Sequence, residues 1–411
     1  MHTSPHWRRN AAFFIAGQFL SMFGSMLVGH SLTWHITLQE QSGSMIALFT
    51  CASMLPMVFI SPFAGVWADR YNRKYLINIA DAGIALVTLI VAVLYAFDMR
   101  SIWFLFVAAM ARSAGQGVQQ PAVNALIPQI VPEEHIARFN GIQSTAQSLT
   151  MFAAPMAAGA LLSFLPIEYV FFIDVITAAI GIATVFFCVK VSGVPDIKER
   201  GAGIKAYYNE MAEGVRFIGS QAWLKTLFIF SAIFGVLVSP AAMLTPLQIT
   251  RAFGEDVWRL SLIEITFSIG MMAGGVLITI WGGFKNKAHT MVLSWIVFGV
   301  TMVLFGIVGN FWVYLGIMIV CGVTMPLFNT PCMTIIQTKI PANIMGRVFS
   351  VMGMINGIAL PLGTALFGPL GDLMRIEILF IITGSMIFAG GFALRSRREV
   401  MGAGIVQPSA V

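Results

Sequence analysis

Twelve long apolar runs, separated by short polar segments, occupy most of this 411-residue sequence. An apolar helix needs about 20 residues to cross a bilayer, and each run has roughly that length or more. Charged residues make up only 10% of the chain, against roughly 25% in soluble domains. The sequence therefore predicts an all-α membrane protein with twelve transmembrane helices. They are expected within residues 11–38, 44–68, 75–97, 101–128, 140–165, 168–190, 222–249, 258–281, 289–309, 311–338, 347–371 and 376–394.

The two halves of the chain repeat a pattern of prolines and arginines. Pro132 precedes Arg138 by six residues, and Pro341 precedes Arg347 by the same interval. Because six crossings return the chain to its starting side, the halves are predicted to be parallel repeats, two six-helix bundles related by an axis along the membrane normal. We expect an N-terminal bundle over residues 1–190, a cytoplasmic linker over 191–221, a C-terminal bundle over 222–395 and a tail over 396–411.

The linker carries an apolar stripe. Ile204, Tyr208, Met211, Val215 and Ile218 recur at alternating spacings of four and three residues, which is typical of an amphipathic helix. We expect this helix to lie on the membrane face.

The basic residues lie singly or in small groups between the apolar runs. With the N-terminus placed in the cytoplasm, 19 of the 24 lysines and arginines fall on the cytoplasmic side and four outside, as the positive-inside rule requires. The net charge of +6 thus reflects topology, and no nucleic-acid partner is expected. Both termini are predicted to be cytoplasmic. The first apolar run, which follows Arg8 and Arg9, is predicted to be a retained helix rather than a signal peptide.

Motifs of soluble enzyme chemistry are missing from the sequence. It contains no G-x-x-x-x-G-K-[ST], no H-E-x-x-H and no G-x-S-x-G, and no two of its four cysteines have C-x-x-C spacing. We therefore expect no enzyme, no cofactor and no metal site. If the chain moves a solute uphill, an ion gradient must drive it. One charge falling through 100 mV yields about 2.3 kcal/mol, so one proton per cycle would suffice.

The loop between the second and third runs carries the most specific motif. It reads Gly65-Val66-Trp67-Ala68-Asp69-Arg70-Tyr71-Asn72-Arg73-Lys74. This segment resembles the loop signature of the major facilitator superfamily, G-x-x-x-D-R-x-G-R-K. Asn72 replaces the last glycine of that signature, and asparagine tolerates the left-handed backbone that a glycine would adopt. The resemblance implies a cytoplasmic gate formed by Gly65, Asp69, Arg70, Arg73 and Lys74. The alternative is that the basic residues serve only to fix topology.

Other segments extend the resemblance along the whole chain. They are Pro121–Pro128, Val131–Glu134, Ile263–Phe267 and Gly346–Ser350. The chain is similar to bacterial drug exporters of the macrolide efflux and enterobactin exporter type. This resemblance implies the major facilitator fold, a bacterial cytoplasmic (inner) membrane, and a monomer that exports a small molecule.

The fourth run has a polar face that cannot point at lipid. Arg112, Gln116, Gln119 and Gln120 fall at positions i, i+4, i+7 and i+8 of the predicted helix. An arginine near the bilayer centre costs about 2.5 to 3.5 kcal/mol on insertion scales, so it should face a cavity or a partner. We expect a substrate cavity lined by Arg112, Gln116, Gln119, Gln120, Gln18, Asn329, Met333 and Gln337. The alternative for Arg112 is a structural tie to a neighbouring carboxylate.

Three acidic residues lie inside apolar runs: Asp81, Asp174 and Glu264. Ionisable groups at such positions are costly and are functional candidates by default. Glu264 is the first candidate for proton coupling because Ser268, Met271 and Gly275 share its face of the helix and would let water or substrate approach.

These observations predict a proton-coupled efflux transporter, an antiporter of amphipathic small molecules such as macrolide-type drugs. It would work by alternating access, with protons, the substrate and the lipid bilayer as its partners. Alternatives on the same fold are a siderophore exporter and an uptake system or a lipid transporter. A membrane sensor that transports nothing is the alternative from another class.

Overall fold

The computed structural model describes residues 7–189 and 204–405. Both ranges are helical, and neither contains a β-strand. Residues 7–189 form α1 (Trp7–Glu40), α2 (Gly43–Arg70), α3 (Arg73–Ala96), α4 (Ile102–Ile130), α5 (Glu133–Phe164), α6 (Ile167–Ala183) and the π turn η1 (Thr184–Cys188). Residues 204–405 form α7 (Ile204–Ser220), α8 (Ala222–Leu237), the π turn η2 (Pro240–Leu244), α9 (Thr245–Phe253), α10 (Val257–Trp281), α11 (Lys287–Phe305), α12 (Phe311–Lys339), α13 (Ala342–Leu373), α14 (Ile376–Ser396) and α15 (Arg398–Ala403).

The helices reproduce the predicted number of membrane crossings. Eleven segments of the described ranges are long and apolar enough to span a membrane, with α8, η2 and α9 counted together as one. Helix α4 falls below the hydropathy of the others because Arg112 and its glutamines are polar. Its 29 residues are nevertheless more than a bilayer requires. With α4 included, the chain is an all-α membrane protein with the twelve predicted crossings.

Local sequence explains where several helices begin. The side chains of Asn72, Asn286 and Asn310 accept hydrogen bonds from backbone N–H groups in the first turns of α3, α11 and α12. Such caps satisfy donors that have no partner within the helix. The paired prolines of the sequence repeat, Pro132 and Pro341, stand at the N-cap positions of α5 and α13.

The chain divides into two compact units. The first comprises residues 1–39 and 51–207, and the second comprises residues 40–50 and 208–411. The division falls within α7, inside the linker expected from the sequence. It also assigns the first eight residues of α2 to the second unit, which the hydropathy pattern did not anticipate.

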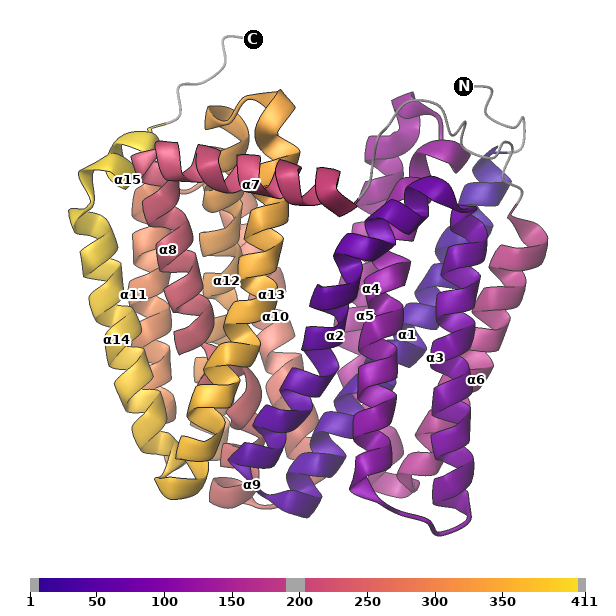
Figure 1. Ribbon diagram of the computed structural model, residues 1–411. Coiled ribbons are helices and arrows are strands. Elements are labelled where there is room, and N and C mark those ends of the chain that lie inside the picture. The colour runs from indigo at the N-terminus through magenta and orange to yellow at the C-terminus, as the bar shows by residue number, and fades with distance from the viewer. Residues whose placement is uncertain (1–6, 190–203, 406–411) are drawn as a thin grey trace. The chain divides into compact units, whose positions relative to one another are not determined.

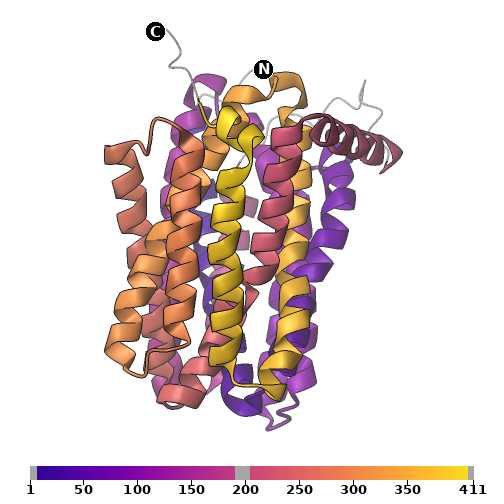
Figure 2. The same ribbon diagram turned by 90° about the vertical axis from the view of Figure 1, so that its left-hand side faces the viewer.

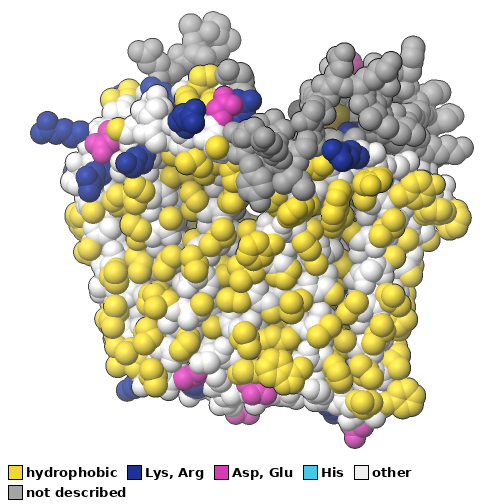
Figure 3. All heavy atoms as spheres, viewed as in Figure 1, with side chains coloured by type: hydrophobic (Ala, Val, Ile, Leu, Met, Phe, Trp, Pro, Cys, Tyr) yellow, Lys and Arg dark blue, Asp and Glu magenta, His cyan; other side chains and the backbone are white. Residues whose placement is uncertain are grey.

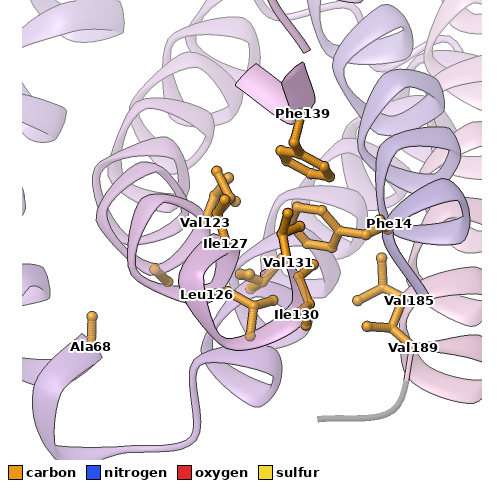
Figure 4. Close-up of a cluster of buried hydrophobic side chains, with 13 residues drawn as sticks. Phe14, Ala68, Val123, Leu126, Ile127, Ile130, Val131, Phe139, Val185 and Val189 are labelled. Atoms are coloured by element: carbon orange, nitrogen blue, oxygen red, sulfur yellow. The ribbon is translucent and has the colours of Figure 1, made fainter. Parts of the chain in front are cut away.

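Each unit packs its long helices side by side (Figure 1). A buried cluster of the first unit includes Phe14, Val123, Leu126, Phe139 and Val185, which come from α1, α4, α5 and η1 (Figure 4). In the second unit α14 packs against α8 and α11, and the turned view shows the long helices of this unit with their axes roughly aligned (Figure 2).

The linker helix α7 lies across the ends of the long helices of the second unit (Figure 1). Glu213 accepts a hydrogen bond from Arg347 of α13 at 2.7 Å. Ile218 is 7% exposed and belongs to a buried cluster of that unit, against which Met211 also packs. Part of the predicted apolar stripe therefore packs on protein. Val215 of the same stripe is 55% exposed and faces outward.

The surface carries the apolar belt of a membrane protein. Hydrophobic side chains cover the middle of the face shown in Figure 3, and charged side chains gather near its two ends. Large apolar residues such as Ile79, Phe187 and Ile280 are 69%, 75% and 82% exposed. Exposure of this extent is unfavourable in water and favourable in hydrocarbon.

Candidate functional site

Arg112 is held inside the first unit by an ion pair. Its guanidinium donates to the Asp174 carboxylate at 2.5 Å, to the Thr88 hydroxyl at 3.0 Å and to the Ser25 carbonyl at 3.0 Å. The side chains of Arg112 and Asp174 are only 6% and 1% exposed. These contacts join α1, α3, α4 and α6. The alternative role of Arg112, a structural tie to a neighbouring carboxylate, therefore has Asp174 as its partner.

Asp81 is the other buried acid of the first unit. It is 5% exposed and accepts a hydrogen bond from the Gln119 amide at 2.7 Å. Among the described residues no lysine, arginine or histidine forms an ion pair with it. Asp81 thus differs from Asp174, whose charge is matched by Arg112.

A polar cavity of about 210 Å³ opens beside these groups in the first unit. The predicted residues Gln18, Gln116, Gln119 and Gln120 all line it, and Arg112 does not. Helix α5 adds two glutamines that the sequence analysis missed, Gln143 and Gln147. Their i, i+4 spacing is the signal that identified the face of α4, and it could have found them.

The second unit encloses a separate cavity of about 190 Å³ with apolar walls. Glu264 of α10 is the one charged residue that lines it. The π turn η2 forms part of the wall through Ala241 and Ala242. Pro240 opens this turn, and because proline has no N–H it cannot continue a regular helical hydrogen-bond ladder. The remaining lining residues are Val238, Thr245, Pro246, Ile263, Phe267, Phe298, Phe305, Met318, Cys321 and Met325.

The predicted polar face of α12 does not join this cavity. Asn329 and Gln337 are exposed. Met333 packs against a buried cluster of the second unit. The structure therefore places Glu264 among apolar side chains and not beside these amides.

The loop after α2 is tied to helix ends. Arg73 donates to the carbonyls of Ala68 and Ala125 at 2.9 and 3.0 Å. Lys74 donates to the carbonyls of Phe186 and Val189 at 2.6 and 2.8 Å. The carbonyls of Ala68, Phe186 and Val189 lie at the C-terminal ends of α2 and η1, where carbonyls have few partners within the helix, while that of Ala125 lies inside α4.

For the other predicted gate residues, Gly65, Asp69 and Arg70, the structure gives no side-chain hydrogen bond or ion pair within the described ranges. Arg70 is exposed, and a side chain at Gly65 would meet open space. The side chain of Asp69 lies outside the described residues. Asn72 corrects one expectation, because its φ of −64° is not left-handed; it serves as the N-cap of α3 instead.

The sequence model of the Major Facilitator Superfamily matches residues 14–364. The chain belongs to this superfamily. It is 25% identical to macrolide efflux protein A of Streptococcus pyogenes over 94% of this chain and 95% of that protein. It is 26% identical to macrolide efflux protein A of Enterococcus faecalis over 78% of this chain and 99% of that protein. A crystal structure of a mutant of the nucleoside transporter NupG has the same fold, with a TM-score of 0.74 at 13% identity over 94% of this chain and 99% of that chain.

A further group in this superfamily member was missed by the sequence analysis. The Asp372 carboxylate, at the end of α13, accepts hydrogen bonds from the backbone N–H groups of Gly43 and Ser44 at 2.6 and 2.8 Å and from the Ser42 hydroxyl at 2.9 Å. Arg251 donates to the Gln41 carbonyl at 2.5 Å beside it. All these residues belong to the second unit. Asp372 thus caps the start of α2, where a negative charge is favourable.

The packing around Asp372 is close. A Cβ built on Gly43 would meet the carbonyl oxygen of Gly368, one turn before Asp372, so both helices need glycine here. The spacing of Gly368 and Asp372 repeats that of Gly65 and Asp69. This shared G-x-x-x-D pattern is the signal by which the sequence could have identified Asp372.

Proposed function

We propose that this protein exports amphipathic small molecules, macrolide-type drugs among them, in exchange for protons across the bacterial inner membrane. The observation that carries the proposal is Glu264, a single carboxylate in an otherwise apolar cavity. Aromatic and methionine side chains accommodate the apolar body of a ligand. The Glu264 carboxylate attracts a cationic amine on the same ligand. The names of the relatives support the same substrate class.

Proton coupling follows from the competition at one group. A protonated Glu264 has no charge with which to hold a cation, and an ionised Glu264 does. If each conformation of the transporter exposes Glu264 to one side, a proton entering from outside displaces the substrate there. Glu264 then releases this proton to the cytoplasm before the next substrate binds. In this cycle the protein works as a monomer with both termini in the cytoplasm.

The test is a flux measurement in proteoliposomes with an acidic lumen. We expect a radiolabelled macrolide to enter these vesicles faster than it enters protein-free vesicles with the same pH gradient. Alkalinisation of the lumen should accompany this flux. Protein-free vesicles are essential because a weak base also accumulates passively. Equal rates in both preparations, or a protein-dependent rate that does not change when the gradient is removed, would contradict proton-coupled export.

The cytoplasmic gate is part of the proposal, with Asp69 as its acidic member and Arg70, Arg73 and Lys74 beside it. We expect Asp69→Asn to insert and fold normally but to transport about tenfold more slowly. The reason is that charge-assisted hydrogen bonds and helix-dipole interactions contribute about 1–2 kcal/mol. Initial flux rates measure the effect.

A matched control for this variant is Asp98→Asn. Asp98 is 87% exposed at its side chain, and its φ of 64° is one that asparagine tolerates. Its flux should equal that of the wild type. Normal flux through Asp69→Asn would reduce the loop motif to a topology signal.

A further inference from the structure

The polar cavity of the first unit differs chemically from the cavity around Glu264. Six glutamines line it: Gln18, Gln116, Gln119, Gln120, Gln143 and Gln147. None of its lining residues carries a charge. Its remaining wall contains Phe14, Phe19, Ile15, Met22, Met26, Val123 and Ala146, together with Ser21 and Ser25. The cavity therefore combines an array of neutral amides with an apolar wall.

Most of these amides are not used to hold the helices together. Among the described residues, Gln116, Gln120, Gln143 and Gln147 have no hydrogen-bonded side-chain partner. Gln119 donates to Asp81 at 2.7 Å and lies 3.5 Å from Gln18.

The Gln18 amide independently indicates a binding site. Its Nε2 is buried and has no hydrogen-bond partner within the described ranges. Buried polar atoms are normally paired, because an unpaired one has lost its water without gaining a partner. The buried Gln18 donor is therefore unfavourable unless a bound group accepts a hydrogen bond from it, whereas Gln120 and Gln147 are exposed.

The charged side chains nearby do not line the cavity. Arg112 is bound to Asp174, Thr88 and the Ser25 carbonyl. Asp81 is 5% exposed and is bound by Gln119, one of the lining residues. A charged ligand would thus lose its hydration without meeting an opposite charge on the wall.

A neutral ligand with several hydroxyl groups fits the same wall. Each glutamine amide offers two donors and one acceptor, and each hydroxyl both donates and accepts. The C–H face of a sugar ring can pack on an aromatic side chain such as Phe19. About 210 Å³ is less than the 300–1,000 Å³ of pockets that enclose a whole drug-sized ligand, so the cavity suits one ring and not an entire molecule.

We propose that this glutamine cavity binds a neutral, hydroxyl-rich group of the ligand, such as a sugar ring, and makes the transporter selective for glycosylated molecules. The inference rests on the proposed function, because the ligand is taken to be the exported molecule. It adds the substrate class that the apolar cavity around Glu264 does not define.

The test compares a matched pair of probes, 4-methylumbelliferone and its β-D-glucoside. Equilibrium dialysis against the full chain in nanodiscs, without any gradient, measures both affinities. We expect the glucoside to bind about tenfold more tightly. Gln116→Leu and Gln147→Leu should abolish this preference and leave the affinity of the aglycone unchanged.

Gln129→Leu is the matched control, because Gln129 belongs to α4 but does not line the cavity. This variant should keep the tenfold preference. Elution as a single species and the unfolding temperature show whether each variant is folded. The anionic probe 4-methylumbelliferyl sulfate should bind no more tightly than the aglycone.

Three results would overturn the inference. They are equal affinities for the aglycone and the glucoside, an equal loss of affinity for these two probes in the cavity variants, and tighter binding of the sulfate than of the aglycone. The flux assay in proteoliposomes, made from the same purified protein, separates this outcome from a failure of the proposed function. A glucoside preference without proton-coupled flux would support the cavity and reject export. Coupled flux without the preference would reject the cavity alone.

Discussion

Replacing Arg112 by leucine is expected to lower the free energy of unfolding by about 3–5 kcal/mol, because the substitution leaves a buried carboxylate without its cation. The Asp174 side chain is 1% exposed, so water cannot take the place of the guanidinium. Arg112→Leu also leaves the Thr88 hydroxyl and the Ser25 carbonyl without this donor. Thermal or denaturant unfolding of the purified protein in detergent measures the loss.

Two further variants identify the cause. The double variant Arg112→Leu with Asp174→Leu removes both charges and should recover most of the stability, because buried ion pairs often contribute little over apolar residues. Arg395→Leu removes an exposed arginine that forms no ion pair with the described residues and should change stability by less than about 1 kcal/mol. A double variant as unstable as Arg112→Leu would contradict an ion-pair origin.

Glu264→Gln is expected to reduce gradient-driven export to the level of protein-free vesicles. Glutamine keeps the size and polarity of the side chain but can neither release a proton nor attract a cation. In the variant, macrolide binding should persist at a weaker affinity, because the cationic amine has lost its ionic partner. Equilibrium binding in detergent and flux in proteoliposomes give the two readings.

Glu377→Gln is a suitable control for this variant. Glu377 belongs to the same unit and pairs with Arg375 at 3.5 Å, an arginine whose side chain is 79% exposed. Its export should equal that of the wild type. If Glu264→Gln keeps gradient-driven export at the wild-type rate, Glu264 does not couple protons. Asp81 then becomes the first candidate, because Asp174 is already paired with Arg112.

Hydropathy and repeats predicted the helices well, since each crossing is a local property of about 20 residues. The polar face of α4 was also readable, because it depends only on helical spacing. The break in the seventh crossing was not. Residues 222–249 read as one apolar run, yet the chain forms α8, η2 and α9 there. Hydropathy does not distinguish an α-helix, whose carbonyls accept from the N–H four residues ahead, from a π turn, whose carbonyls accept from the N–H five residues ahead. Only Pro240 and Pro246 indicated the change in the sequence.

The contacts of the site depend on tertiary structure. Arg112 and Asp174 are 62 residues apart in the chain, and each alone reads as a costly buried charge. Their pairing requires α4 and α6 to be packed together. The same reason hides the partners of Asp372, which lie at the start of α2 more than 300 residues earlier.

Helix α2 belongs to both units. Residues 43–50 group with the second unit and are fastened there by Asp372, while residues 51–70 group with the first. Pro56 and Pro62 each remove one hydrogen bond from the ladder just beyond the point of division. Any rotation of one unit against the other must therefore either flex α2 near these prolines or detach its first turn from Asp372. The stiffness of α2 therefore contributes to the elastic resistance that such a rotation meets.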